Sequence, residues 1–263
     1  MDYTLIIYAV AVVSIVGLII GLLLGVAGKK FEVEVDERVT KVREHLAGSN
    51  CGGCGFAGCD ACAEAMVAGT AAPNACAPAG AAAATAIGEI LGVAVAEGDP
   101  MTAFVRCAGT CDKTVRKANY YGIQDCRKAA FAPGGGDKAC SYGCMGLGSC
   151  VEACKFDAIH IVDGVAVVDK EKCVACGSCV AVCPKSLITL VPKKAEHLVA
   201  CSNKDKGKDV KAVCDTGCIG CGICAKQCEA DAITVENNLA VIDPAKCTGC
   251  GKCAAKCPAK IIK

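Results

Sequence analysis

Cysteine dominates this sequence, with 26 Cys among 263 residues. Disulfide-stapled secreted domains of such density are usually short, under about 100 residues. Here the Cys form runs such as Cys173, Cys176, Cys179 and Cys183. These residues lie too close together for so many unstrained disulfides. The sequence therefore favours thiolate ligation of metal.

Large apolar side chains are scarce, since the chain has no Trp, five Phe and five Tyr, although 54% of its residues are hydrophobic. One ordinary core would be hard to build from so few of them. We expect several small modules that are nucleated by metal. The net charge of +1 favours neither nucleic acid nor a strongly charged partner.

Residues 3–28 carry no charge. As a helix they would span roughly 39 Å, enough to cross a hydrocarbon core of about 30 Å. Residues 1–28 are therefore predicted to be a transmembrane anchor. A cleaved signal peptide is the alternative, but Met1 and Asp2 supply no basic residue before the apolar stretch.

Lys29 and Lys30 follow the apolar stretch directly. By the positive-inside rule they place the rest of the chain in the cytoplasm, on the inner side of the cell membrane, after a single pass. Gly17, Gly21 and Gly25 recur every four residues. These three glycines either form a face on which another helix packs or are ordinary glycines of a membrane helix.

An internal repeat organises the C-terminal half. Seven Cys recur 74 residues later, so that Cys144, Cys150, Cys154, Cys173, Cys176, Cys179 and Cys183 correspond to Cys218, Cys224, Cys228, Cys247, Cys250, Cys253 and Cys257. The module is therefore duplicated. In each copy an alternating stretch, 158–168 or 232–242, surrounds an Asp-Gly or Asn-Asn pair and predicts a β-hairpin.

The domain boundaries follow from these patterns. We expect an anchor (1–28), an amphipathic connector (29–48), a small α-rich iron-sulfur domain (49–100) and a pre-module segment (101–139). Two ferredoxin-like α+β modules (140–192 and 193–263) follow, the second with its own pre-module segment. The Ala-rich stretch 79–96 should be helical.

The spacing Cys-x2-Cys-x2-Cys-x3-Cys occurs at 173–183, 218–228 and 247–257. It is typical of bacterial ferredoxins, in which the fourth Cys ligates the other 4Fe-4S cluster. Zinc sites use two separated Cys pairs instead. Three ligand sets are predicted: Cys218, Cys221, Cys224 and Cys257; Cys247, Cys250, Cys253 and Cys228; and, by the repeat, Cys173, Cys176, Cys179 and Cys154.

The companion set of the first module is irregular, because Leu147 stands where the second copy has Cys221. We expect Cys140 to replace it, beside Cys144, Cys150 and Cys183. Nearer the N-terminus, Cys51, Cys54, Cys59 and Cys76 lie in a glycine-rich segment that suits a fifth cluster, with zinc as the alternative. Cys62 is expected to be a small buried side chain.

Five further Cys have no assigned set. A sixth cluster is predicted from Cys107, Cys111 and Cys126 with Cys201 or Cys214, and buried metal-free thiols are the alternative. The expected cofactors are thus five or six 4Fe-4S clusters.

His45, His160 and His197 are expected not to be ligands, and neither Gly146-x-Gly148 nor any other segment has the context of a nucleotide loop. A basic stretch suits an acidic redox partner or is a solvated loop; it contains Lys193, Lys194, Lys204, Lys206, Lys208 and Lys211.

The apolar N-terminus, the Cys-x2-Cys-x4-Cys-x16-Cys segment and the run from Tyr142 to Cys150 together resemble the B subunit of the Rnf complex. The resemblance implies a membrane-bound ferredoxin:NAD+ oxidoreductase coupled to Na+ or H+ translocation. In it this chain accepts electrons from reduced ferredoxin, and other subunits hold NAD and flavins. The duplicated module exceeds the single module of shorter relatives. The alternatives are an electron-transfer subunit of another membrane oxidoreductase and a metal-binding assembly or scaffold protein.

Overall fold

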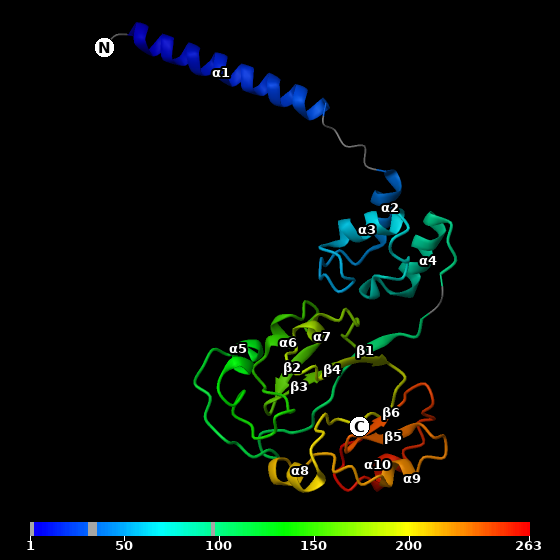
Figure 1. Cartoon of the computed structure of the whole chain (residues 1–263). Helices are drawn as coiled ribbons and strands as arrows, with labels where there is room; N and C mark the ends of the chain where they lie inside the picture. Colours follow the sequence, from blue (N-terminus) through cyan, green and yellow to red (C-terminus); the bar gives the residue numbers. More distant parts are fainter. Residues whose placement is uncertain (1–2, 31–35, 96–97) are drawn as a thin grey trace.

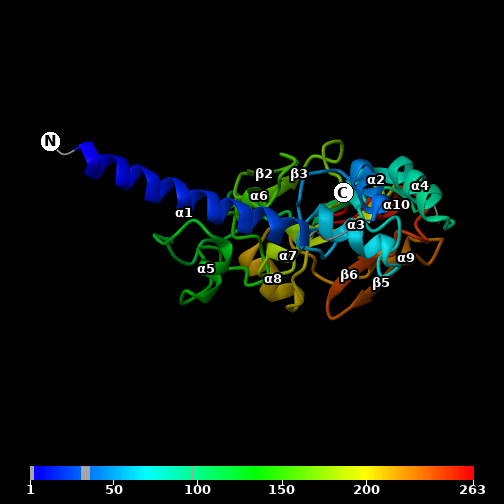
Figure 2. The same cartoon turned by 90° about the horizontal axis from the view of Figure 1, so that it is seen from above.

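The computed structural model describes residues 3–30, 36–95 and 98–263. Helix α1 (Tyr3–Lys30) is long and apolar enough to cross a membrane, and none of its apolar stretch is buried within the chain. Figure 1 and Figure 2 show its N-terminal end outside the folded remainder. A Cβ on Gly17, Gly21 or Gly25 would meet no atom within 4 Å, so the helix-packing face stays a prediction. Residues 31–35 of the predicted connector lie outside the described residues.

A small helical domain follows, built from α2 (Glu37–His45), α3 (Cys59–Val67), the 3-10 turn η1 (Ala77–Ala79) and α4 (Gly80–Leu91). Val42, Met66 and Ile87 are fully buried in one core. The assignment of 29–48 to a connector is therefore wrong for α2, because its apolar face packs on α3 and α4. Helix α4 ends earlier than predicted, since Gly92 adopts a left-handed conformation (φ 68) that caps it.

The first ferredoxin-like module contains β1 (Met101–Val105), α5 (Cys126–Phe131), α6 (Ser149–Glu152), β2 (Ile159–Val162), β3 (Val165–Val168), α7 (Ser178–Val182) and β4 (Ile188–Pro192). The β2–β3 hairpin is confirmed, and Asp163 and Gly164 at its turn both have positive φ. Strand β1 pairs antiparallel with β4. The predicted boundary at 139/140 is wrong, because β1 supplies the backbone partners that β4 needs.

The second module repeats this plan with α8 (Gly207–Val213), α9 (Ile223–Lys226), β5 (Ile233–Glu236), β6 (Leu239–Ile242) and α10 (Lys252–Lys256). The β5–β6 hairpin turns at Asn237 and Asn238, again with positive φ. The pairing of β1 with β4 is shortened here to one bridge, Val199 with Ile262, which matches Val105 with Ile188 in the first module.

The three folded units contact one another in chain order (Figure 1). Lys155 of the first module donates to the carbonyl oxygen of Asn50 in the helical domain (2.9 Å). Between the two modules, the N–H of Val115 donates to Val213 O (3.0 Å) and the N–H of Asp215 donates to Lys113 O (2.9 Å). These backbone bonds fix the modules against each other at the segment that contains Cys214.

Candidate metal centres

A left-handed glycine precedes each of the four short helices in the modules. Gly148, Gly177, Gly222 and Gly251 have φ between 72 and 85 and stand at the N-cap of α6, α7, α9 and α10. The second residue of each helix is a Cys of the adjoining run: Cys150, Cys179, Cys224 and Cys253. Because glycine adopts positive φ without steric cost, the chain can curl tightly there and turn successive thiols toward one point.

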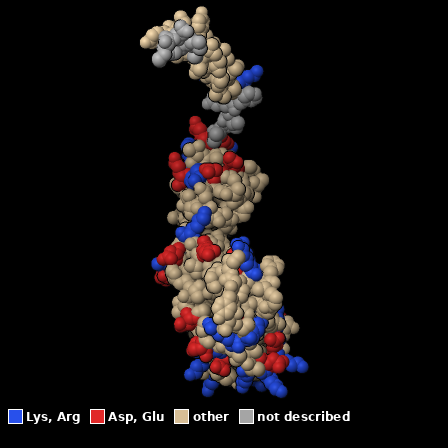
Figure 3. All heavy atoms as spheres, turned by 90° about the vertical axis from the view of Figure 1, so that its left-hand side faces the viewer, with Lys and Arg blue, Asp and Glu red and all other residues tan. Residues whose placement is uncertain are grey.

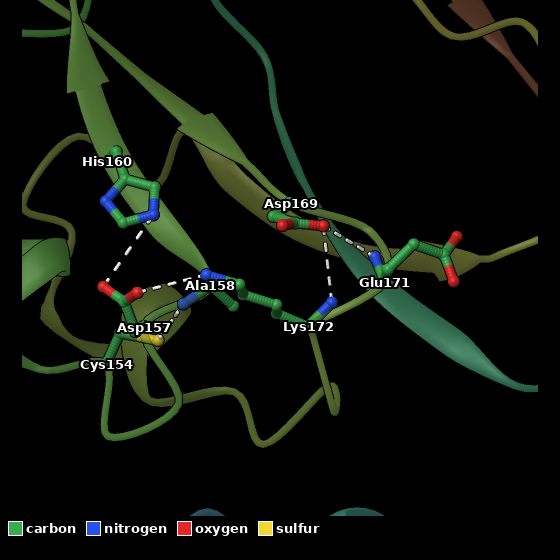
Figure 4. Close-up of polar contacts among 7 residues, drawn as sticks. All are labelled: Cys154, Asp157, Ala158, His160, Asp169, Glu171 and Lys172. Carbon is green, nitrogen blue, oxygen red and sulfur yellow. Dashed lines mark hydrogen bonds and ion pairs between the residues drawn. The ribbon is translucent and has the colours of Figure 1, made fainter.

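Figure 4 draws the turn after Cys154 and the turn from Asp169 to Lys172, which precedes Cys173 in the sequence. The N–H of Ala158 donates to Cys154 Sγ (3.5 Å), and one carboxylate oxygen of Asp169 accepts the N–H of Glu171 (2.9 Å). Asp157 pairs with Lys172 (3.2 Å) and lies 3.8 Å from His160 at the exposed edge.

The second copy reproduces the same turns. There the N–H of Ala232 donates to Cys228 Sγ (3.4 Å), and Asp243 accepts the N–H of Ala245 (2.9 Å). Both turns therefore follow from local sequence that the duplication retained.

One predicted set surrounds a single cavity in the first module. Cys154, Cys173, Cys176 and Cys179 line one apolar cavity. Burial raises the pKa of Cys179 to about 11, and the thiolates of Cys176, Cys173 and Cys154 add to this increase. Four closely spaced thiols in an apolar wall repel one another as thiolates. A bound cation is therefore needed for all four to be ionised together.

The second module brings one of its predicted sets together in the same way, since Cys218, Cys221, Cys224 and Cys257 line one apolar cavity. In the other set, burial raises the pKa of Cys253, with further contributions from neighbouring Cys247 and Cys250. The repeat predicts Cys228 as the fourth member of that set. Cys221 and Cys250 are exposed, so both sets reach the protein surface.

The irregular set of the first module differs from the prediction. Cys144, Cys150 and Cys183 line a cavity with Cys126, and Cys140 is not among its lining residues. Burial raises the pKa of Cys150 to about 12, and Cys144, Cys126 and Cys183 are the charged neighbours that add to it. The N–H of Cys126 is held by Ser149 Oγ (2.6 Å), which fixes the start of α5 beside α6. The fold therefore brings Cys126 rather than Cys140 to this cavity.

The predicted sixth set is also rearranged. Cys126 belongs to the cavity just described, and Cys111 is exposed, with Arg116 as its side-chain donor at 3.9 Å. Cys107, Cys201 and Cys214 line a different cavity, where they are joined by Cys140. A signal for Cys126 existed in the sequence. Cys126 lies in residues present only in the first copy, and the same copy lacks one ligand because Leu147 stands where the second copy has Cys221.

The helical domain gathers the N-terminal Cys. Cys59 and Cys76 are buried, and Cys51 and Cys54 are half-buried. Asn50 accepts the N–H of Cys59 through its side-chain oxygen (2.8 Å), which ties the loop to the start of α3. Cys62 is 1% exposed in the core of α2, α3 and α4, as expected for a small buried side chain, although it neighbours Cys54, Cys59 and Cys76.

The donor chemistry fits iron-sulfur clusters. Among the described residues, no group of three or more His, Cys, Asp and Glu side chains is arranged to hold a single metal ion. The thiols instead stand around cavities whose remaining walls are mostly apolar. Four thiolates that enclose a space, with backbone N–H groups aimed at the sulfurs, suit a cubane rather than one zinc ion.

Comparisons with protein families agree with these centres. Residues 46–78 match the FeS family, an iron-sulfur cluster family. Residues 166–189 match the 4Fe-4S binding domain family, and residues 217–261 match the 4Fe-4S dicluster domain family. The chain therefore contains multiple 4Fe-4S binding domains.

Curated relatives cover nearly the whole chain. The B subunit of the Na+-translocating ferredoxin:NAD+ oxidoreductase complex of Acetobacterium woodii is 50% identical over 89% of this chain and 70% of its own length. The B subunit of an ion-translocating oxidoreductase complex of Methanosarcina acetivorans is 44% identical over 92% of each chain. The B subunit of the proton-translocating ferredoxin:NAD+ oxidoreductase complex of Clostridium ljungdahlii is 44% identical over 90% of this chain and 84% of its own. With this similarity added to the repeated cysteine loops and the apolar helix α1, the chain belongs to the family of B subunits of ion-translocating ferredoxin:NAD+ oxidoreductase (Rnf) complexes.

Proposed function

We propose that this chain is the iron-sulfur electron-transfer subunit of an ion-translocating ferredoxin:NAD+ oxidoreductase and that it accepts electrons from reduced ferredoxin. The observation that carries the proposal is the repeated enclosure of a cavity by four cysteines. When bound at such sites, 4Fe-4S clusters supply one-electron transfer at potentials set by burial and by hydrogen bonds to sulfur.

The geometry and the repeat support five ligand sets. They are Cys51, Cys54, Cys59 and Cys76; Cys154, Cys173, Cys176 and Cys179; Cys126, Cys144, Cys150 and Cys183; Cys218, Cys221, Cys224 and Cys257; and Cys228, Cys247, Cys250 and Cys253. Each of the three regular Cys runs gives its first three thiols to one set and its fourth to the neighbouring set. In the irregular run, Cys144 and Cys150 join one set and Cys154 joins the other. This exchange supports close spacing of the two centres within a module.

Contacts between the sets support a continuous relay. Gly53, in the loop between Cys51 and Cys54, packs directly on the backbone of Cys176 in the first module. Cys150 and Cys154 lie on and just after α6, whereas Cys179 and Cys183 lie on and just after α7, and the two helices pack together. No long stretch of protein therefore separates the N-terminal set from the sets of the first module.

Charge supports the second module as the docking face for ferredoxin. Residues 193–263 hold twelve Lys and eight Asp and Glu. Figure 3 shows Lys and Arg side chains gathered at the end of the molecule farthest from α1. Four exposed Lys around α8 contribute to this basic end: Lys204, Lys206, Lys208 and Lys211. An acidic redox partner would be steered toward such a face.

The membrane association of the protein rests on α1. Its last turn carries Lys29 and Lys30, and the positive-inside rule puts these residues on the cytoplasmic side. The cysteine domains then face the cytoplasm, where reduced ferredoxin is available and thiols stay reduced.

Stopped-flow mixing of the full chain in lipid nanodiscs with reduced ferredoxin tests the proposal. We expect rapid bleaching of the cluster absorbance and no steady NAD+ reduction by the chain alone. The double variant Lys206→Glu/Lys208→Glu should lower the second-order rate constant about tenfold at low salt. The matched double variant Lys128→Glu/Lys170→Glu changes net charge equally on the first module and should leave the rate constant unchanged.

The outcomes separate the parts of the proposal. Equal loss in both variants would contradict docking on the second module while leaving electron acceptance intact. Failure of the wild-type chain to be reduced would contradict the proposed function itself.

A further inference from the structure

Lys138 is a buried lysine to which the proposed function gives no role. It is 5% exposed, and its Nζ donates to Gly109 O (2.8 Å) and to Gly164 O (2.7 Å). Among the described residues no carboxylate pairs with it, and the adjacent Asp137 pairs with Arg116 instead (3.4 Å). An ammonium group that is buried without an anion is costly. A source of negative charge close to Lys138 would therefore stabilise it.

One cysteine set of the first module lies beside this ammonium group. Lys138 and Gly164 line a hollow together with Gly146, which follows Cys144 by two residues. A Cβ on Gly146 would lie 2.6 Å from the Gly164 carbonyl oxygen, to which Lys138 donates. Burial raises the pKa of the Cys144 thiol, and the positive charge of Lys138 opposes this increase. The charge therefore acts on the proposed set of Cys126, Cys144, Cys150 and Cys183 (the Cys144 set).

A second lysine lines the cavity of the Cys144 set itself. Lys185 lies beside Cys183 and Cys144 in the wall of that cavity, and it is partly buried. It also forms no ion pair within the part of the chain that the structure describes. Two lysines without carboxylate partners there thus lie close to one cysteine set.

The second module has neither lysine. At the 74-residue offset Lys138 corresponds to Ala212, and Lys185 corresponds to Ala259. Ala259 lines the cavity of the equivalent set in the second module, as Lys185 does in the first. That equivalent set consists of Cys218, Cys221, Cys224 and Cys257 (the Cys218 set). Two copies of one site therefore differ by two positive charges.

The hairpin turns separate the charge of Lys138 from its structural role. In the first module Lys138 joins Gly164, at the β2–β3 turn, to Gly109. In the second module Asn238 stands at the position of Gly164, and its side-chain amide donates to Lys204 O (3.1 Å). Lys204 lies in the segment that corresponds to that of Gly109. A neutral amide makes the equivalent link there, so a structural role alone would not require a charged group.

We propose that Lys138 and Lys185 raise the midpoint potential of the cluster in the Cys144 set above that of the cluster in the Cys218 set. The proposal deepens the proposed function and rests on it for the identity of the cofactor. A bound 4Fe-4S cluster gains one negative charge when it is reduced, so a nearby cation stabilises its reduced state. The two lysines therefore favour the passage of one electron from the second module to the first. The donor set is oxidised by that electron, the acceptor set is reduced by it, and no bond is formed or broken.

A redox titration of the anaerobically purified full chain, followed by electron paramagnetic resonance, tests the proposal. In Lys138→Gln the reduced-to-oxidised ratio of one cluster should fall about tenfold at a fixed potential, which corresponds to about 59 mV for a one-electron couple. Lys185→Gln should lower the ratio of the same cluster about threefold, because water screens a partly exposed charge. Iron content should be unchanged in both variants, since no ligand is altered.

Matched variants separate charge from structure. Lys185→Arg retains the charge and should keep the wild-type potential. Lys113→Gln removes an exposed lysine from the same module and should shift no cluster, because its charge is screened by solvent. Ala259→Lys adds the missing cation to the second module and should raise the potential of a different cluster.

A Cys126→Ala background identifies the cluster that the lysines affect. This background should lack the cluster of the Cys144 set, so the addition of Lys138→Gln should shift none of the remaining signals. A shift in that background, or unchanged potentials in both lysine-to-glutamine variants, would overturn this proposal and leave electron acceptance from ferredoxin standing. If Lys138→Gln does not fold, opposite shifts of different clusters in Lys185→Gln and Ala259→Lys support the proposal, and the absence of both shifts overturns it. A wild-type chain without any iron-sulfur signal after reduction would overturn the proposed function as well.

Discussion

Gly53 lies so close to the main chain of Cys176 that a Cβ on Gly53 would overlap the Cys176 carbonyl group. The two residues come from different domains, and each belongs to a loop that contains proposed cluster ligands. Because φ of Gly53 is not positive, an L-residue would fit its backbone conformation there. Close packing of the two domains, and not backbone conformation, is therefore the reason that residue 53 is a glycine.

Gly53→Ala should weaken the docking of the helical domain on the first module by about 1–3 kcal/mol, the cost of an overpacked contact. Iron content should stay the same, since no ligand changes. Limited proteolysis near residues 92–100 should become faster. Gly98→Ala is the control, because its Cβ would meet open space. Equal cleavage rates for wild type and Gly53→Ala would contradict a docked domain.

Gly146 and Gly148 provide a matched pair in one cysteine loop. Both have positive φ, and a Cβ on Gly146 would lie 2.6 Å from the Gly164 carbonyl oxygen, whereas Gly148 faces open space. Gly148→Ala should cost about 1 kcal/mol through backbone strain. Gly146→Ala should cost about 1–3 kcal/mol more through overlap with the β2–β3 turn.

Anaerobic heating followed through cluster absorbance measures the difference. Gly146→Ala should lose its clusters at a lower temperature than Gly148→Ala. The reverse order would show that the contact with Gly164 does not form.

Cys126 and Cys183 are expected to ligate the same cluster. Cys126→Ala and Cys183→Ala should each remove about four irons, and the double variant should remove no more than either single variant. Iron and sulfide analysis checks this. An additive loss of about eight irons would place the two thiols on different clusters.

Cys51 and Cys62 distinguish ligand from packing residue in the helical domain. Cys51→Ala should remove about four irons, because its spacing from Cys54 completes the predicted set. Cys62→Ala should retain them, since Cys62 is 1% exposed in the apolar core of α3. If Cys62→Ala lost iron and Cys51→Ala did not, Cys62 would be the ligand and Cys51 the packing residue.

The orientation of α1 is tested by reporter fusions after Lys263. A cytoplasmic reporter should be active and a periplasm-dependent reporter silent, because Lys29 and Lys30 retain the C-terminal side of the helix in the cytoplasm. Replacing both Lys by Glu should weaken this preference. The opposite pattern of reporters in the wild-type chain would refute the topology.

Much of the architecture was readable from the sequence, because local rules govern it. Cys-x2-Cys-x2-Cys-x3-Cys loops need a left-handed glycine and a short helix, and the hairpins need residues that tolerate positive φ. The loops and the hairpins both depend on residues that are close in sequence. The second copy of the 74-residue repeat therefore forms the same loops and hairpins. The apolar stretch of α1 was equally evident from composition.

Tertiary structure alone decided which distant thiols meet. A triplet of closely spaced Cys specifies three corners of a cubane, but the fourth ligand can come from any segment that the fold brings near. Cys126 lies in residues absent from the second copy, so the repeat alignment gave no indication of it and Cys140 was predicted as the substitute. In the fold, the pairing of β1 with β4 and the backbone bonds between Val115 and Val213 carry Cys107 and Cys140 to the boundary with Cys201 and Cys214. Sequence spacing does not encode such long-range contacts, because they depend on how separate modules pack.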